Sequence, residues 1–196
     1  KSTNILIHAL TAFALAWLFR SILLAAGVAG GRVRWLAPAL ALAWAVHPLQ
    51  VSSALYPVQR MQTMGTLLLV LALLAYLHAR RTQIAGESGR TGMLLALLAW
   101  VVSLGCKEDT VLLPAYTLAL ELTVLRFAAS DALLSQRLYR GYLFASVAGA
   151  AAYILWVLPN HWYWEAYPGR DFSTPERLLT QARVLYELAH RGPLVA

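Results

Sequence analysis

Charged residues are scarce in this sequence. Asp, Glu, Lys and Arg make up 13% of the 196 residues, whereas hydrophobic residues make up 60%. A soluble domain averages about 25% charged residues. A chain of this length cannot bury so much apolar surface in a core of its own, so lipid must cover part of it. The scarcity of charge argues against a soluble domain and predicts an integral membrane protein.

Cysteine is almost absent, with Cys106 as the single example. One cysteine excludes an internal disulfide framework and a zinc site built from several cysteines. The histidines show no metal-ligand spacing, so we predict neither a metal nor a resident cofactor. The net charge of +7 would suggest nucleic acid in a soluble protein. Here the arginines lie in short loops between apolar runs, which predicts no nucleic-acid partner.

Short polar turns separate six apolar segments. Several are shorter than the roughly 20 residues that a perpendicular span needs, so we expect their helices to extend into flanking polar residues. Pro48 and Pro159 are expected to end helices. The sequence thus predicts an all-α polytopic membrane protein with about six transmembrane helices. These are Asn4–Phe19, Trp35–Val46, Met61–Leu77, Met93–Cys106, Thr110–Leu125 and Gly141–Leu158.

The residues after Leu158 are mixed in character. Thr174 and Pro175 are typical of a helix start, and an apolar stripe from Leu178 to Leu188 predicts an amphipathic helix at the membrane surface. We expect a transmembrane helical region over 1–158 and a non-cytoplasmic loop with this interfacial helix over 159–196. The chain has no initiator Met, and we expect it to be an excerpt of a longer protein.

The charges of the loops alternate along the chain. Three loops carry net charges of +3, +2 and +2, and by the positive-inside rule these are cytoplasmic. They hold Arg20, Arg32 and Arg34; then Arg80, Arg81, Glu87 and Arg90; then Arg126, Asp131, Arg137 and Arg140. The segments His47–Arg60 and Lys107–Asp109 and the tail then face the periplasm or a lumen.

Unusual polar residues gather on this non-cytoplasmic side. They comprise the cations Arg60, Lys107, His47 and Arg170, the aromatics Trp162, Tyr163 and Trp164, and the carboxylates Glu108 and Asp109. Asn4 and His8 share a helix face near the same membrane surface. A lipid phosphate that carries a sugar would suit this set. Cations would hold the phosphate, aromatics would stack on the sugar, and a carboxylate would act as base.

Each group also has a structural interpretation. The aromatics suit an interfacial belt, Arg60 and Lys107 suit helix-end anchors, and the two acids suit a helix N-terminus. His8 and His47 are expected to be hydrogen-bonded packing residues. Glu121 lies within an apolar run, about 7–8 Å from its end by helical rise. For it we expect snorkelling or an interhelical hydrogen bond rather than a proton relay.

Three blocks of this sequence resemble a known family. They are His-Pro-Leu-Gln-Val-Ser-Ser-Ala-Leu-Tyr-Pro-Val-Gln-Arg-Met (47–61), Cys-Lys-Glu-Asp-Thr-Val-Leu-Leu-Pro (106–114) with Glu121, and Asn-Ile-Leu-Ile-His (4–8). They are similar to bacterial membrane proteins with tetratricopeptide (TPR) tails, related to the transmembrane-and-TPR O-mannosyltransferases. Phe172–Leu185 also resembles the segment that follows these spans in that family.

The resemblance implies a GT-C glycosyltransferase of the bacterial inner membrane. Such an enzyme moves sugar from a polyprenyl-phosphate carrier to a protein or glycan acceptor at the periplasmic or lumenal face. The lipid-linked sugar is the donor substrate, and membrane lipid surrounds the protein. The blocks imply donor-phosphate binding by Arg60, Lys107 and His47. From the polar clustering on the same side we add Arg170 to the phosphate site and expect Trp162, Tyr163 and Trp164 to contact the sugar or acceptor.

The resemblance leaves the catalytic base open. The family's usual catalytic Asp is expected before Lys1, and its TPR repeats after Ala196. Asp109 departs from the small or hydroxyl residue expected there, so Glu108 and Asp109 are the candidates within the chain. A transporter, a flippase or a structural subunit of a membrane complex remains the alternative. Glu121, Pro38 and Pro114 lie within spans, which would fit a transporter or flippase.

Overall fold

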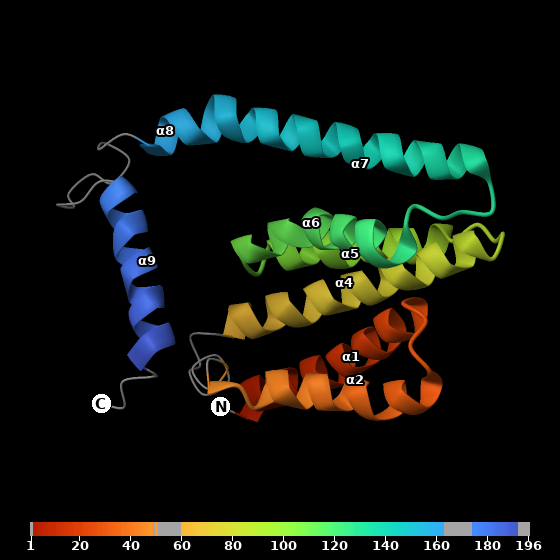
Figure 1. Cartoon of the computed structure of the whole chain (residues 1–196), viewed down its shortest axis with the longest axis horizontal. Coiled ribbons are helices and arrows are strands. Elements are labelled where there is room, and N and C mark those ends of the chain that lie inside the picture. Colours follow the sequence, from red (N-terminus) through yellow and green to blue (C-terminus); the bar gives the residue numbers. More distant parts are fainter. Residues whose placement is uncertain (1, 49, 51–59, 163–173, 192–196) are drawn as a thin grey trace. The chain divides into compact units, whose positions relative to one another are not determined.

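The computed structural model describes residues 2–48, 50, 60–162 and 174–191, and every regular element in those ranges is helical (Figure 1). The chain forms two compact units, Lys1–Tyr139 and Arg140–Ala196. The first unit holds α1 (Ser2–Ala25), α2 (Gly30–Ala45), α4 (Arg60–Ile84), α5 (Arg90–Leu104), the 3₁₀ helix η2 (Glu108–Leu112), α6 (Leu113–Leu120) and the π-helix η3 (Glu121–Leu125). Helix α7 (Ala132–Ala152) crosses the boundary, and the π-helix η4 (Tyr153–Val157), α8 (Leu158–Trp162) and α9 (Thr174–Arg191) follow.

All six predicted apolar segments are helical, which confirms the all-α class. Within the described residues, three helices are long and apolar enough to cross a membrane: Ser2–Ala25, Arg60–Ile84 and Ala132–Asn160. Helices α2 and α5 have 16 and 15 residues, fewer than a perpendicular span needs. The three long helices indicate a membrane protein, while the count of six crossings stays a prediction.

Two predictions about helix ends are wrong. Pro159 does not end a helix, because it falls in the first turn of α8, where a missing N–H is tolerated, directly after a π-helical turn. Arg80 is not in the basic loop, because α4 continues to Ile84 and Arg80 is completely buried within it. The helix predicted to begin at Thr174 does begin there.

Three turns join helices on the side of the bundle where the basic loops lie. Gly27 and Gly86 have φ of +79° and +92°. Each ends a helix with the paired backbone hydrogen bonds of a Schellman motif, such as Val28 N–H to Leu23 O at 3.0 Å and Glu87 N–H to Thr82 O at 2.9 Å. The third turn lacks glycine at this point. There Arg126 and Phe127 adopt φ of 52° and 53°, an unfavourable region for residues with a Cβ.

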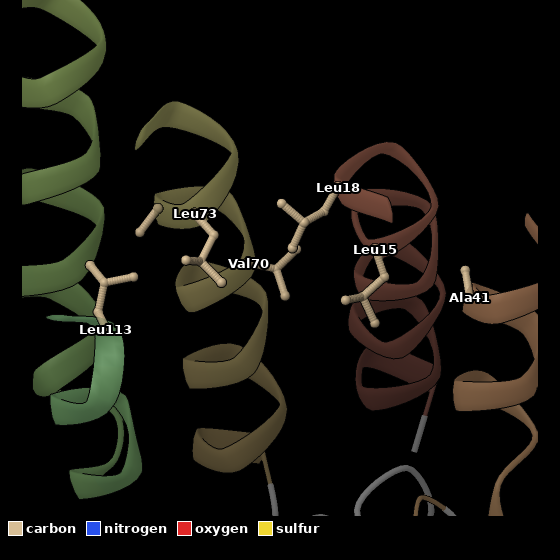
Figure 2. Packing of buried hydrophobic residues seen from close by; sticks show 7 residues of the cluster. Leu15, Leu18, Ala41, Val70, Leu73 and Leu113 are labelled. Carbon is tan, nitrogen blue, oxygen red and sulfur yellow. The ribbon is translucent and has the colours of Figure 1, made fainter. Parts of the chain in front are cut away.

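The core of the first unit forms where α1, α2, α4 and α6 meet. Figure 2 shows Leu15 and Leu18 of α1 beside Val70 and Leu73 of α4, with Ala41 on one side and Leu113 on the other; all of them are buried. Other large apolar side chains point outward, and Phe13 and Trp17 are 76% and 66% exposed. Such exposure suits a lipid-facing surface.

Close helix contacts fix how α4 and α5 pack. A Cβ added at Gly92 would lie 2.8 Å from the Cβ of Ala79 and 3.1 Å from the carbonyl oxygen of Ala75. Glycine is therefore needed for the approach of these two helices, as at many helix contacts in membranes.

The first unit has two distinct ends. At the end we call the Asn4 end, Arg60 contacts Asn4, and His8 contacts the carbonyl oxygen of Ala45. At the opposite Arg81 end, Arg81 donates to the carbonyl oxygen of Ser21, and Ser130 N–H donates to Gln83 O. The two sets of loops that differ in predicted charge therefore gather at different ends.

Candidate functional site

The Asn4 end brings together residues that the sequence analysis placed on one side of the membrane. Arg60 is the first residue of α4, and its Nε donates to Oδ1 of Asn4 at 3.4 Å. Asn4 lies in the first turn of α1 and is 1% exposed, whereas the Arg60 side chain is exposed. The contact joins two helices and holds a cation at the end of the bundle.

A small polar cavity of about 140 Å³ lies next to this contact. Its lining comes from α1, α4, the end of α2 and one residue beyond α2: His8, Thr11, Trp44, Gln50, Gln62, Thr63 and Thr66. Nε2 of His8 lies 3.0 Å from the carbonyl oxygen of Ala45, and its ring stacks on Trp44 at 5.0 Å between centroids. The expectation that His8 is a hydrogen-bonded packing residue is confirmed.

Several polar groups of this cavity can accept hydrogen bonds from a ligand. Thr11, Thr63 and Thr66 each donate their hydroxyl proton to a backbone carbonyl of their own helix, at 2.8, 3.0 and 2.9 Å. Their oxygen lone pairs remain for a ligand. Oε1 of Gln62 is buried and receives no hydrogen bond within the described part of the chain. The cavity therefore suits a group that donates hydrogen bonds, such as a hydroxyl.

Lys107 is held at the same end by the packing of its loop on α4. A Cβ built at Gly65 would lie 3.4 Å from Cγ2 of Thr110 and 3.6 Å from Cβ of Lys107. Gly65 lies about 7.5 Å along α4 from Arg60 by helical rise. The indole N–H of Trp100 donates to Thr110 O at 2.8 Å and anchors the loop to α5. Arg60 and Lys107 thus flank one end of α4.

The candidate carboxylates lie beside Lys107. Glu108 and Asp109 form the first turn of η2, and both are exposed. Asp109 Oδ2 is 3.7 Å from Nζ of Lys107. Two acids in a first helical turn also fit the capping interpretation, so their position alone does not favour a role as base.

Of the remaining predicted residues, His47 follows α2 at the Asn4 end, and the others lie in the second unit or outside the described residues. His47 is exposed just after α2, and its N–H donates to Trp44 O. Trp162 is the last residue of α8, and its side chain is outside the description. Tyr163, Trp164 and Arg170 lie outside the described residues.

Sequence reasoning missed the polar start of α4. Gln62, Thr63 and Thr66 fall within the segment Met61–Leu77, which we treated as an apolar span. Gln62 and Thr66 are four residues apart and thus share a helix face, which is the signal that could have identified them.

A second polar cluster lies deep between α4 and η3. Oε1 of Glu121 accepts hydrogen bonds from the hydroxyl of Tyr76 at 2.6 Å and from Nε of Arg80 at 2.5 Å. Arg80 also donates to Oε1 of Gln83 at 2.7 Å and to Ala128 O at 2.6 Å. The interhelical hydrogen bond predicted for Glu121 is confirmed. Because these groups satisfy one another, we assign the cluster to structure rather than to binding.

Metal ligands do not cluster in the part of the chain that the structure describes: no three His, Cys, Asp or Glu side chains there are placed to hold an ion. Comparison of the chain with family models, with curated proteins and with solved structures gave no match.

Proposed function

We propose that the chain belongs to a membrane glycosyltransferase that moves a sugar from a polyprenyl-phosphate carrier to a protein or glycan acceptor at the Asn4 end. One observation carries this proposal: Arg60 and Lys107 lie at the same end of the bundle as a cavity lined by hydroxyl and amide groups. Two cations suit a phosphate, and the cavity suits hydroxyl groups.

The two parts of such a donor match the two parts of the site. The phosphate would lie between the exposed guanidinium of Arg60 and the ammonium of Lys107, which would displace the long Lys107–Asp109 contact of 3.7 Å. A hydroxyl of the sugar would donate to Oε1 of Gln62. An unpaired buried acceptor costs about 1–3 kcal/mol, so a donating ligand would recover that free energy.

The chemistry requires a base and a leaving group. An acceptor hydroxyl oxygen attacks the anomeric carbon, the bond from that carbon to the phosphate oxygen breaks, and the carrier leaves as polyprenyl phosphate. The two cations stabilise the charge on the departing phosphate. A carboxylate takes the hydroxyl proton, and Asp109, 3.7 Å from Lys107, is a candidate within the chain.

The test is sugar transfer in membrane vesicles by the protein that carries this chain. Arg60→Ala and Lys107→Ala should each lower transfer at limiting donor at least about tenfold, because a paired phosphate would lose one cation. Arg60→Lys should restore only part of the activity if the contact is bidentate. Arg90→Ala removes an exposed cation at the opposite end and serves as control. Full activity in both Ala variants, with normal insertion, would refute the proposal.

A transport function is the second candidate, and one observation favours it. The helical segment 108–125 changes its hydrogen-bond pattern twice, because a 3₁₀ helix, a short α-helix with Pro114 in its first turn and a π-helix follow one another. Interrupted helices line substrate paths in many transporters. Movement of a lipid-linked sugar across vesicles without transfer to an acceptor would distinguish this function.

A further inference from the structure

A long groove runs between α1 and α4 and ends at a basic side chain. The groove has a volume of about 530 Å³. Phe13, Trp17 and Leu71 form its outer walls and are substantially exposed, while the buried Leu77 lies deeper. The small residues Ala14 and Ala75 leave room between the helices.

The length of the groove matches one leaflet of a bilayer. Along α4 its lining extends from Leu71 to Arg81, which corresponds to about 15 Å by helical rise. Half of the hydrocarbon thickness of a bilayer is also about 15 Å. A single acyl chain of one leaflet would therefore fill the groove from the middle of the membrane to its surface.

Charge identifies the head group that fits the mouth of this groove. Arg81 and His78 lie there, and none of the described lining residues is acidic. Nη2 of Arg81 donates to Ser21 O at 2.5 Å, which fixes the guanidinium across the two helices. A guanidinium has five N–H donors, and Arg81 makes no second hydrogen bond within the described ranges. An anionic phosphate would pair with it.

A neighbouring groove repeats this arrangement. It lies between α1 and α2, has a volume of about 620 Å³ and shares Trp17 with the first. Arg20 and Arg34 line it together with Leu24 and Pro38. The cations at the mouths of both grooves lie near the helix ends that the charge pattern assigns to the cytoplasmic side.

We propose that the α1–α4 groove binds an anionic phospholipid of the cytoplasmic leaflet, with one acyl chain along Trp17 and Leu71 and its phosphate on Arg81. Apolar walls alone would accept any lipid, so the preference for an anionic head group arises from Arg81. The alternative occupant, a helix of a second copy, would bury the same walls without any need for phosphate.

Native mass spectrometry of the detergent-purified protein tests this site. The protein is titrated with phosphatidylglycerol and with phosphatidylcholine of identical acyl chains. Wild-type protein should retain phosphatidylglycerol preferentially. Arg81→Gln should lower that preference about fivefold, the effect of about 1 kcal/mol for one cation near an anionic head group. Arg81→Lys should keep most of it, and Ala75→Leu, which fills the groove, should weaken retention of both lipids.

Arg90→Gln is the matched control, since it removes the same charge at the same end but outside the groove. Equal retention of the two lipids by wild type, equal losses in Arg81→Gln and Arg90→Gln, or a lipid-free dimer would overturn the proposal. A second measurement leaves Arg81 unchanged. Brominated phosphatidylglycerol should quench tryptophan fluorescence more than brominated phosphatidylcholine, and Trp17→Phe should reduce that difference. A difference that Trp17→Phe leaves unchanged would equally contradict the site.

Discussion

Arg80 and Glu121 form an ion pair in which neither side chain is exposed, with Nε of the arginine 2.5 Å from Oε1 of the glutamate. The pair connects α4 to η3. It also holds the turn that lacks glycine, because Glu121 Oε2 accepts the N–H of Phe127 at 3.1 Å and Arg80 donates to Ala128 O. The carboxylate and guanidinium thus stabilise this turn by hydrogen bonds to its backbone, whereas at the other two turns Gly27 and Gly86 adopt the positive φ that the turn requires.

We therefore predict that breaking the pair is costly. Glu121→Ala or Arg80→Ala leaves an uncompensated buried charge, and each should lower the free energy of unfolding by about 3–5 kcal/mol. Thermal unfolding in detergent measures this loss. The exposed pair Arg183–Glu187, at 3.3 Å, is the control. Arg183→Ala should change stability by less than about 1 kcal/mol. Similar small losses in all three variants would show that the buried pair does not hold the fold.

Glycines at helix contacts give a second prediction. Gly92→Ala places a methyl group against Ala79 and should destabilise the protein by about 1–3 kcal/mol through overpacking. Gly141→Ala is the matched change, since nothing lies within 4 Å of the added Cβ. In a helix it should be neutral or stabilising by up to about 1 kcal/mol. Unfolding midpoints that fall equally in both variants would contradict the close α4–α5 contact.

The two ends of the first unit should face opposite sides of the membrane. In a Cys106→Ser background, Asp109→Cys at the Asn4 end should react with a membrane-impermeant thiol reagent added from outside intact cells. Glu87→Cys at the Arg81 end should react only after the membrane is opened. Both positions are exposed in the protein, so access depends on the membrane. The reverse pattern of labelling would invert the orientation and move the proposed site to the cytoplasm.

A substitution of Gln62 distinguishes a binding role from a structural one. Gln62→Leu removes a buried oxygen that accepts no hydrogen bond from the described residues, so stability should stay the same or rise by up to about 2 kcal/mol. Affinity for the lipid-linked sugar should nevertheless fall. Gln83→Leu is the contrasting change, because Gln83 is bonded to Arg80 and its loss should destabilise. Unchanged donor affinity in a well-folded Gln62→Leu protein would remove the cavity from the site.

The sequence predicted the helices well because apolar runs and turn residues act locally. The six segments are helical, and Thr174-Pro175 marks the true start of α9. Helix extents were less predictable. Arg80 stands beside Arg81 in a basic stretch, and only a partner 41 residues away, Glu121, makes its burial favourable. The hydropathy pattern cannot predict that Arg80 pairs with Glu121, because the two residues are far apart in the sequence.

The sequence predicted only part of the candidate site, because some of its residues come together only through tertiary packing. Asn4, His8, Arg60 and Lys107 were assigned to one side by loop charge, and the structure gathers them at one end. The cavity beside them depends on Thr11, Gln62 and Thr66, whose hydroxyl and amide groups meet only when α1 packs on α4. Such a cavity is a tertiary feature, and periodicity alone suggests no more than a polar face.

The most direct test of the proposed function is to locate the bound donor. A polyprenyl-phosphate sugar with a photoreactive group next to its phosphate is cross-linked to the protein in membranes, and the labelled peptides are identified by mass spectrometry. The account predicts labels near Asn4, near Arg60 and within 107–110, all of which excess unlabelled donor should suppress. Specific labels confined to 84–90 and 126–131, at the Arg81 end, would contradict it.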